Sequence, residues 1–380
     1  MTRSHATVGN VFIGGRWAPA RVAWRDGVFS AIEPLEKCNE GLFLVPGFID
    51  LHCHGGGGAD AMEGVEAVRQ IARTHAAHGT AGFLVTTMTA PLPEIAAALS
   101  AVARVMEKQG EDEAEILGVH LEGPFISPDQ LGAQPPFAIP ATVDLMRRFC
   151  ELAPIKVVTL APESDLHGEV AAWLRARGIR VQIGHTSIDF GTATDWVRQR
   201  VDGVTHLFNA MGGFHHRKSG CIGAALAFAD HAELIGDLHH TDIGALLAAF
   251  RAIPNLYAVT DGTAASGMPD GEYRLGQHAV FRQGGTVRLK DGGLAGSCLT
   301  MDRVFHNLIS VGLTLEDAVK RTSTIAANYV GASQYGQLAV GKPASFVGAD
   351  KRGEILTVIS RGAVLRDDDR SYETESRATA

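Results

Sequence analysis

Six residues with metal-binding or proton-transferring side chains each stand at the end of a short apolar segment of this 380-residue sequence. Imidazole and carboxylate groups bind zinc, iron, manganese or cobalt, so the set could hold one or two divalent metal ions, with zinc favoured. A bound metal lowers the pKa of water toward about 7 and polarises a carbonyl group, which is the chemistry of a hydrolase. The six residues are His52, His54, Glu122, His185, His206 and Asp261.

The first two histidines lie two positions apart in the segment VPGFIDLHCH. On a β-strand, residues at this spacing project from the same face, so His52 and His54 can bind one metal while Cys53 points away. Two histidines at this spacing, without further support, are often only two polar residues at a strand end. The other strand ends therefore decide the interpretation.

Glu122 precedes a Gly-Pro break, where its carboxylate could bind one metal or bridge two. His185 and His206 end two further apolar segments, and Asp261 ends another. An aspartate beside an attacking water can take its proton and return it to the leaving nitrogen. Each residue alone could be a capping acid or a core histidine, but together they indicate one catalytic site.

Short β-branched segments alternate with Ala- and Leu-rich helical segments, which is typical of parallel βαβ units. Eight expected strands favour a (β/α)8 barrel of the TIM type, with the six residues at its catalytic mouth. A doubly wound open sheet is the alternative. Helices are expected at 91–109, 169–177 and 243–253. The expected strands are 42–51, 82–87, 116–121, 156–160, 179–183, 203–205, 233–235 and 256–260.

The two ends of the chain carry short apolar segments separated by glycine-containing turns, which indicates small β-strands. We expect residues 1–45 and 336–370 to pair into a small β-sandwich domain beside the barrel, which spans 46–335. Residues 371–380 are polar and are expected to form a frayed tail.

The formal net charge of −8, with both signs interspersed, argues against binding to nucleic acid or to an anionic membrane. No apolar run reaches the roughly 18 residues needed to span a bilayer, and the start has no signal-peptide core, so a cytoplasmic location is expected. Five scattered cysteines without a CxxC pair suggest reduced thiols rather than disulfides or a structural zinc site.

Six motifs occur in order: PGFIDLHCHG, HLEGPF, GHTS, THLFNAM, VTDG and AGSCLTM. With them the chain resembles the N-acetylglucosamine-6-phosphate deacetylases of the amidohydrolase superfamily. The resemblance implies hydrolysis of an amino-sugar-phosphate acetamide to acetate and amine, with Asp261 as general base and then acid. It assigns Glu122, His185 and His206 as principal metal ligands. Because His52 and His54 are also present, it implies a two-metal centre bridged by Glu122.

The same resemblance implies the substrate contacts. His239 matches a histidine that contacts the sugar, and Met301 matches a residue lining the acetyl pocket. Asn209, Ala210 and Arg217 match positions that hold the phosphate. The arginine comes from the neighbouring subunit in this family, which implies a homodimer. By itself, the basic run around Arg217 could equally be a solvated loop.

Gln134 stands where the family usually has a histidine that polarises the substrate carbonyl. An amide can donate a hydrogen bond to an oxyanion but cannot become cationic. The enzyme could therefore be slower, or act on another acylated sugar such as N-acetylgalactosamine-6-phosphate, or on an amide without phosphate. A silent sugar-phosphate sensor is disfavoured, because Asp261 and every candidate ligand are present.

Overall fold

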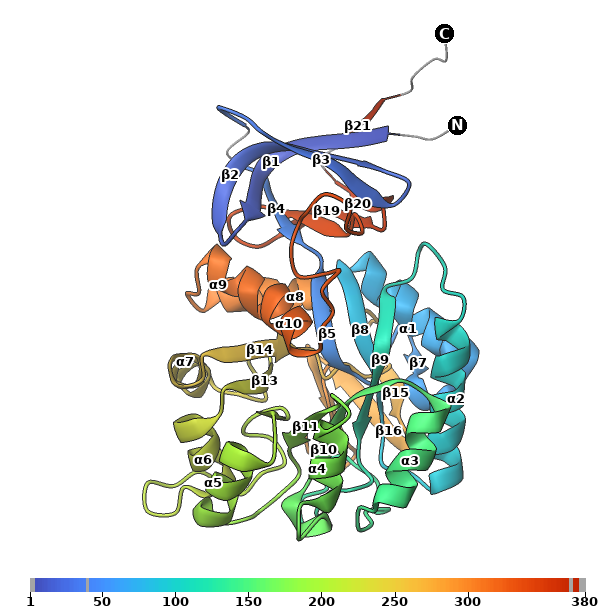
Figure 1. Cartoon of the computed structure of the whole chain (residues 1–380), viewed down its shortest axis with the longest axis vertical. Helices are drawn as coiled ribbons and strands as arrows, with labels where there is room; N and C mark the ends of the chain where they lie inside the picture. The colour runs from blue at the N-terminus through green and yellow to red at the C-terminus, as the bar shows by residue number, and fades with distance from the viewer. Residues whose placement is uncertain (1–3, 39–40, 369–371, 376–380) are drawn as a thin grey trace.

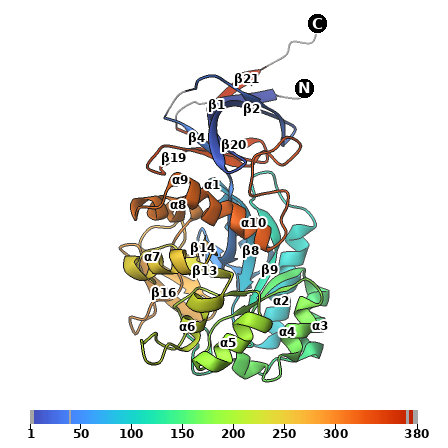
Figure 2. The ribbon, with the colours of Figure 1, turned by 60° about the vertical axis from the view of Figure 1, so that its left-hand side comes forward.

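The computed structural model describes residues 4–38, 41–368 and 372–375. Parallel strands curl around a central axis, while strands from both chain ends form a separate sheet at one end of the molecule (Figures 1 and 2). Within the described ranges, every helix is too short or too polar to cross a lipid bilayer.

The central sheet is parallel, in the order β12-β11-β10-β9-β8-β5, and β13 pairs with β14 beside it. Main-chain hydrogen bonds join the end of β14 back to β5, from Asp261 N to His52 O at 2.9 Å and from His54 N to Gly262 O at 2.8 Å. The predicted eight-stranded barrel is confirmed, and the open sheet is excluded. Its strands are β5 (Phe48–Cys53), β8 (Thr80–Thr87), β9 (Glu115–Glu122), β10 (Ile155–Leu160), β11 (Arg180–Ile183), β12 (Gly203–Val204), β13 (His231–Ile235) and β14 (Asn255–Val259).

Helices cover the outside of the barrel because each presents an apolar stripe to the strands. In α2, for example, Ile95, Leu99 and Val102 are fully buried at helical spacing. The three predicted helices are found as α2, α4 and α7. The helices are α1 (Val65–Ala77), α2 (Leu92–Met106), α3 (Val143–Leu152), α4 (Glu169–Arg175), α5 (Phe190–Gln199), α6 (Gly220–Phe228), α7 (Ile243–Ala252), α8 (Met301–Ser310), α9 (Leu315–Val319) and α10 (Ile325–Tyr329).

The sheet made from both chain ends has the order β20-β19-β18-β4-β1-β2-β3, and β21 pairs with the first residues of β1, Ser4 to Thr7. Trp24, Phe29 and Phe346 pack together in its core. Within the expected tail, residues 372–375 form β21. The strands are β1 (Ser4–Ile13), β2 (Arg16–Arg25), β3 (Val28–Pro34), β4 (Phe43–Pro46), β18 (Phe346–Ala349), β19 (Ile355–Ser360), β20 (Ala363–Asp367) and β21 (Tyr372–Glu375).

The apolar run 42–51, expected as one strand, is divided at Gly47 into β4 of the terminal sheet and β5 of the barrel. A Cβ atom at Gly47 would lie 2.7 Å from the Cβ of Ala81. Only glycine allows this close approach, so the chain passes directly from one sheet to the other.

An antiparallel sheet that the sequence patterns do not predict follows β14. It contains β15 (Gly271–Leu275), β16 (His278–Gln283) and β17 (Thr286–Arg288). Leu275 from this sheet and Leu294 from the loop after it reach the pocket described below. The insertion therefore adds one wall to the barrel mouth.

Candidate active site

A pocket opens at the carboxyl ends of the barrel strands, where the sequence predicted the catalytic residues. His52 lies fully buried directly beneath it. The aliphatic part of the lining comes mainly from Met88, Ile235, Leu275 and Leu294. The polar side chains in the lining are His54, Glu122, Gln134, His185, His206, Asn209, His240 and Asp261.

Three of these residues have a left-handed backbone conformation. The φ angles of His185, His206 and Asp261 are 49°, 27° and 48°. Residues other than glycine rarely adopt positive φ, and such conformations concentrate at functional sites. At each position the chain turns sharply as it leaves its strand, and this turn brings the side chain into the cluster.

The ionisable side chains form two groups that share Glu122. In the first, Glu122 Oε1 lies 3.2 Å from His185 Nε2 and 2.9 Å from His206 Nε2. In the second, the Nε2 atoms of His52 and His54 are 3.2 Å apart, and each lies 3.4 Å from Asp261 Oδ1. Glu122 joins the groups, because its Oε1 is 3.4 Å from His52 Nε2 and its Oε2 is 3.1 Å from His54 Nε2.

This arrangement fits divalent metal ions. The facing Nε2 atoms of His185 and His206, 3.1 Å apart, can share only one proton, whereas a cation between them would satisfy both lone pairs. All the converging donors are imidazole nitrogens or carboxylate oxygens, as borderline divalent metals prefer.

The pKa shifts in the cluster favour ionised carboxylates and protonated histidines, so the carboxylates stabilise positive charge beside them. Burial alone would raise the pKa of Glu122, but the charge of His52 and hydrogen bonds from His185 and His206 hold it well below its usual range. Burial would likewise raise the pKa of Asp261, but the charge of His52 and the hydrogen bond and charge of His54 lower it by more. Although burial lowers the pKa of His54, hydrogen bonds to Asp261 and Glu122 raise it to about 9. Bound metal ions would supply the charge that protonated histidines supply here.

Gln134 lies against Glu122 rather than apart from it. Its Nε2 donates to Glu122 Oε2 at 2.6 Å, and its Oε1 accepts from Thr89 N at 2.7 Å. Because a backbone N–H can only donate, Thr89 fixes which end of the amide faces Glu122. One Nε2 hydrogen remains for another acceptor in the pocket.

A family model for the amidohydrolase family matches residues 43–365. This chain belongs to the amidohydrolase family. It is therefore a hydrolytic enzyme of a family that works with a divalent metal.

The relatives of this amidohydrolase include an N-acetylglucosamine-6-phosphate deacetylase of Bacillus subtilis (strain 168), 38% identical over 332 residues and 84% of each chain. An N-acetylgalactosamine-6-phosphate deacetylase of Escherichia coli O157:H7 is 35% identical over 337 residues, covering 86% of this chain and 89% of the relative. A mutant N-acetyl-D-glucosamine-6-phosphate deacetylase from Mycobacterium smegmatis, solved with N-acetyl-D-glucosamine-6-phosphate, superposes with a TM-score of 0.87 at 26% identity. That match covers 95% of this chain and 99% of the other. The resemblance seen in the motifs is confirmed.

The residues expected to contact substrate in this amidohydrolase divide into two sets. Asn209 and Ala210 line the pocket. His239 is exposed outside the lining, whereas His240 lies in it, with Nδ1 2.7 Å from Asp237 Oδ2. Two adjacent histidines in a loop give no periodicity from which to choose between them, so the structure favours His240.

Met301 and Arg217 also lie outside the lining. Met301 is fully buried at the start of α8 and packs in a core cluster with Val304 and Phe305, so its expected place in the acetyl pocket is not seen. Arg217 is exposed on the loop that follows Met211. That position leaves it free to face a second subunit.

Two polar residues beneath the pocket were not predicted. Glu233 and His120 are fully buried, and Glu233 Oε2 lies 2.8 Å from His52 Nδ1. Both had a signal in the sequence. Glu233 is a lone acid inside an apolar strand, and His120 lies two positions before Glu122, on the same strand face.

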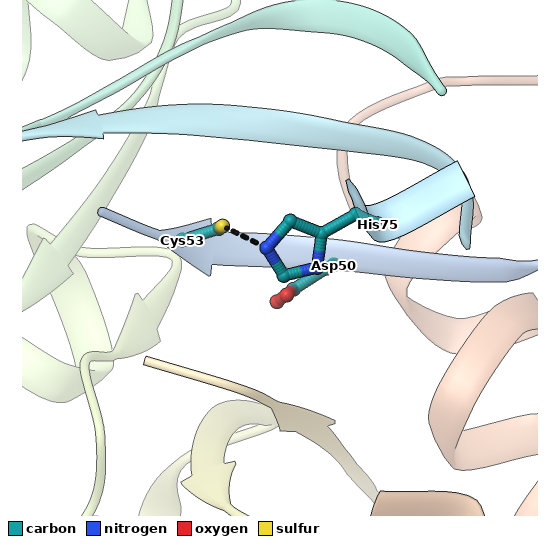
Figure 3. Close-up of side chains that lie close together, drawn as sticks. All are labelled: Asp50, Cys53 and His75. Atoms are coloured by element: carbon teal, nitrogen blue, oxygen red, sulfur yellow. Dashed lines mark hydrogen bonds between the residues drawn. The ribbon is translucent and has the colours of Figure 1, made fainter. Parts of the chain in front are cut away.

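A third buried group, at β5 and α1, comprises Asp50, Cys53 and His75 (Figure 3). His75 Nε2 lies 3.2 Å from Cys53 Sγ and 2.9 Å from the carbonyl oxygen of Gly55, while Asp50 accepts from Thr260 Oγ1 at 2.6 Å. Burial lowers the pKa of His75 to about 4, so its ring is neutral. Since each member already has a protein partner, we assign the group to packing of α1 against the strand that bears His52 and His54.

Proposed function

We propose that this amidohydrolase removes the acetyl group of N-acetylglucosamine-6-phosphate, giving glucosamine-6-phosphate and acetate. The observation that carries the proposal is the position of Asp261 against the Glu122 and histidine cluster in a pocket at the barrel mouth. The deacetylase names of the relatives support the choice of substrate.

We assign two metal positions. His185 and His206 would hold one ion and His52 and His54 the other, with Glu122 bridging them and zinc as the preferred metal. The short distances from Glu122 to histidines of both groups support this assignment. When bound, the metal would activate water and polarise the acetamide carbonyl.

Asp261 would move the proton. Its lowered pKa keeps the carboxylate ionised and able to accept a proton from the attacking water. As the water oxygen bonds to the carbonyl carbon and the C–N bond breaks, Asp261 returns that proton to the departing amine nitrogen. Gln134 lines the same pocket, and its remaining Nε2 hydrogen would donate to the carbonyl oxygen as that atom gains negative charge.

The rest of the substrate would be held by neutral and cationic donors. We place the sugar near His240 and the phosphate beside Asn209 and Ala210. Arg217 of a second subunit would complete the phosphate site, since guanidinium binds phosphate in a bidentate manner. The enzyme would then be a homodimer, which we expect in the cytoplasm.

N-acetylgalactosamine-6-phosphate is the second candidate substrate, because the Escherichia coli relative bears that name and is nearly as similar. The two sugars differ only in the orientation of one hydroxyl group. A panel of N-acetylhexosamines, with and without 6-phosphate, given to metal-loaded enzyme would separate the candidates by acetate release. We expect turnover of a phosphorylated sugar and little of its plain counterpart. Absence of acetate from every phosphorylated sugar would refute the proposal.

The Asp261→Asn variant tests the assigned proton carrier. Asparagine has nearly the same shape but cannot accept the proton, so kcat should fall by about 10²–10⁴. Metal analysis of the same preparation should find the ions still bound. Near-normal turnover would remove Asp261 from the mechanism.

A further inference from the structure

Glu233 lies in the barrel interior below the pocket, where a carboxylate is costly unless it has partners. Its side chain is fully buried. Its Oε2 accepts from His52 Nδ1 at 2.8 Å and from the backbone N of His206 at 3.2 Å. Tyr257 donates to Oε1 at 3.4 Å and in turn accepts from Gln182 at 2.6 Å. The carboxylate is thus held in one orientation from two sides.

The contact with His52 determines which ring nitrogen carries the proton. A carboxylate can only accept, so Nδ1 carries a proton, and it is Nε2, facing His54 and Glu122, that loses its proton to offer a lone pair when a metal ion enters. A carboxylate that accepts from the ring nitrogen not facing the metal also increases the basicity of the ring and fixes its plane.

Among the described residues, no other histidine of the cluster has a carboxylate at its Nδ1. His185 Nδ1 pairs with a backbone carbonyl, that of Gln130, at 2.8 Å. The Nδ1 atoms of His54 and His206 are buried and have no hydrogen-bond partner among the residues that the structure describes. Glu233 contacts a ring nitrogen only in the His52 and His54 half, since its contact with His206 is to the backbone N.

We propose that Glu233 is a positioning residue that makes the His52 and His54 half of the centre a metal site, by fixing the tautomer and orientation of His52. The inference rests on the proposed two-metal centre but not on the identity of the sugar. Removing Glu233 should weaken metal binding at His52 and His54 and leave the site at Glu122, His185 and His206 nearly unchanged.

The test isolates each half in the full-length protein. His185→Asn leaves the His52 and His54 half, and His54→Asn leaves the other half. Glu233→Gln is introduced into both backgrounds, because glutamine keeps the volume and one acceptor but loses the charge. The affinity for Zn²⁺ is then measured by competition with a chromophoric chelator.

Glu233→Gln should lower the Zn²⁺ affinity of the His52 and His54 half by about 10–100-fold, the usual effect of losing an outer partner of a metal ligand. The other half should change by less than about threefold. An equal loss in both backgrounds would indicate a merely structural role and overturn the proposal. So would an unchanged affinity in both.

Tyr257→Phe is the matched control, since it removes a neighbour of Glu233 without touching His52. We expect it to leave both Zn²⁺ affinities intact. If Tyr257→Phe reproduced the effect of Glu233→Gln, the effect would belong to the buried network and the proposal would fail. Neither measurement requires sugar turnover, so the result is independent of the deacetylase assignment.

Discussion

At the scale of single residues, Glu122 and its neighbour Gln134 hold the two halves of the cluster together. Glu122 lies within 3.4 Å of a histidine from each half, and Gln134 is its only amide partner among the described residues. From the sequence alone, Gln134 is mainly a weaker substitute for a histidine. Its contact with Glu122 adds a role in orienting the carboxylate.

Gln134→Leu removes that contact while keeping a side chain of similar length. It leaves Thr89 N–H without its acceptor and removes one of the two partners of Glu122 Oε2, the other being His54. We expect metal affinity to fall by about 10–100-fold and kcat to fall as well. Gln134→His is the informative comparison, because it can still donate. If Gln134→Leu binds metal as tightly as the unaltered enzyme, Gln134 does not orient Glu122.

Metal binding should depend on pH through His54. Its raised pKa of about 9 means that the metal-free enzyme holds a proton there below pH 9, and the entering metal must expel it. The apparent affinity should therefore rise with pH by about tenfold per unit for each displaced proton, then level off above about pH 9. Titration with Zn²⁺ between pH 6 and 9.5 measures the slope. A flat profile from pH 6 to 8 would contradict the charge balance described here, and His54→Asn should make the slope shallower.

At the scale of elements, the strands were predictable because apolar, β-branched segments end in polar residues. β8, β9 and β10 carry this signal strongly, and Glu122 lies at the end of β9, as expected. Two features did not follow from the sequence. The run 42–51 is continuously apolar, so its division at Gly47 depends on contact with Ala81, which is distant in sequence. The strands β15 to β17 are short and largely exposed, so they lack a buried pattern.

Among the site residues too, some positions were predictable from the sequence and others were not. The positions of residues at strand ends follow from the expected strands, whereas the other site residues were assigned only by resemblance. His239 and Met301 were assigned in this way, and neither lines the pocket. Glu233 was overlooked because it lies inside its strand rather than at the carboxyl end, where the other site residues gather.

Gly47→Ala tests the passage between the two sheets. The added methyl group would meet Ala81 Cβ at 2.7 Å and the carbonyl oxygen of Ser345 at 3.2 Å. We expect a loss of about 1–3 kcal/mol in the free energy of unfolding, as for other overpacked core positions. Gly213→Ala is the control, since a methyl group there would have no atom within 4 Å and its effect should stay within about 0.5 kcal/mol. Denaturant titration of both variants gives the comparison, and equal stabilities would contradict the steric account.

At the scale of the whole molecule, the terminal sheet joins the two ends of the chain. β4 pairs with β18, and β1 pairs with β21, so strands distant in sequence share one sheet. The ranges 1–45 with 336–370 and 46–335 remain our proposal for the two domains. All the residues that line the pocket lie within 46–335.

Arg217 provides a test of the proposed homodimer. If it reaches the neighbouring pocket, Arg217→Ala should raise KM for the phosphorylated sugar with little change in kcat. Mixing Arg217→Ala with Asp261→Asn subunits should then restore activity, because one site of each mixed dimer has both residues. Acetate release after subunit exchange measures this. No recovery in mixed dimers would show that Arg217 does not serve a partner.

The hydrogen bond from Asp261 N to His52 O joins β14 to β5 at the candidate active site. Asp261 follows the last strand of the barrel and His52 lies in the first, so their contact closes the barrel. The chain must have left the ribosome at least as far as Asp261 before the proposed proton carrier can face the first histidine. If Asp261 carries the proton as proposed, a partly made or partly opened chain cannot catalyse the reaction, and activity reports on closure of the fold.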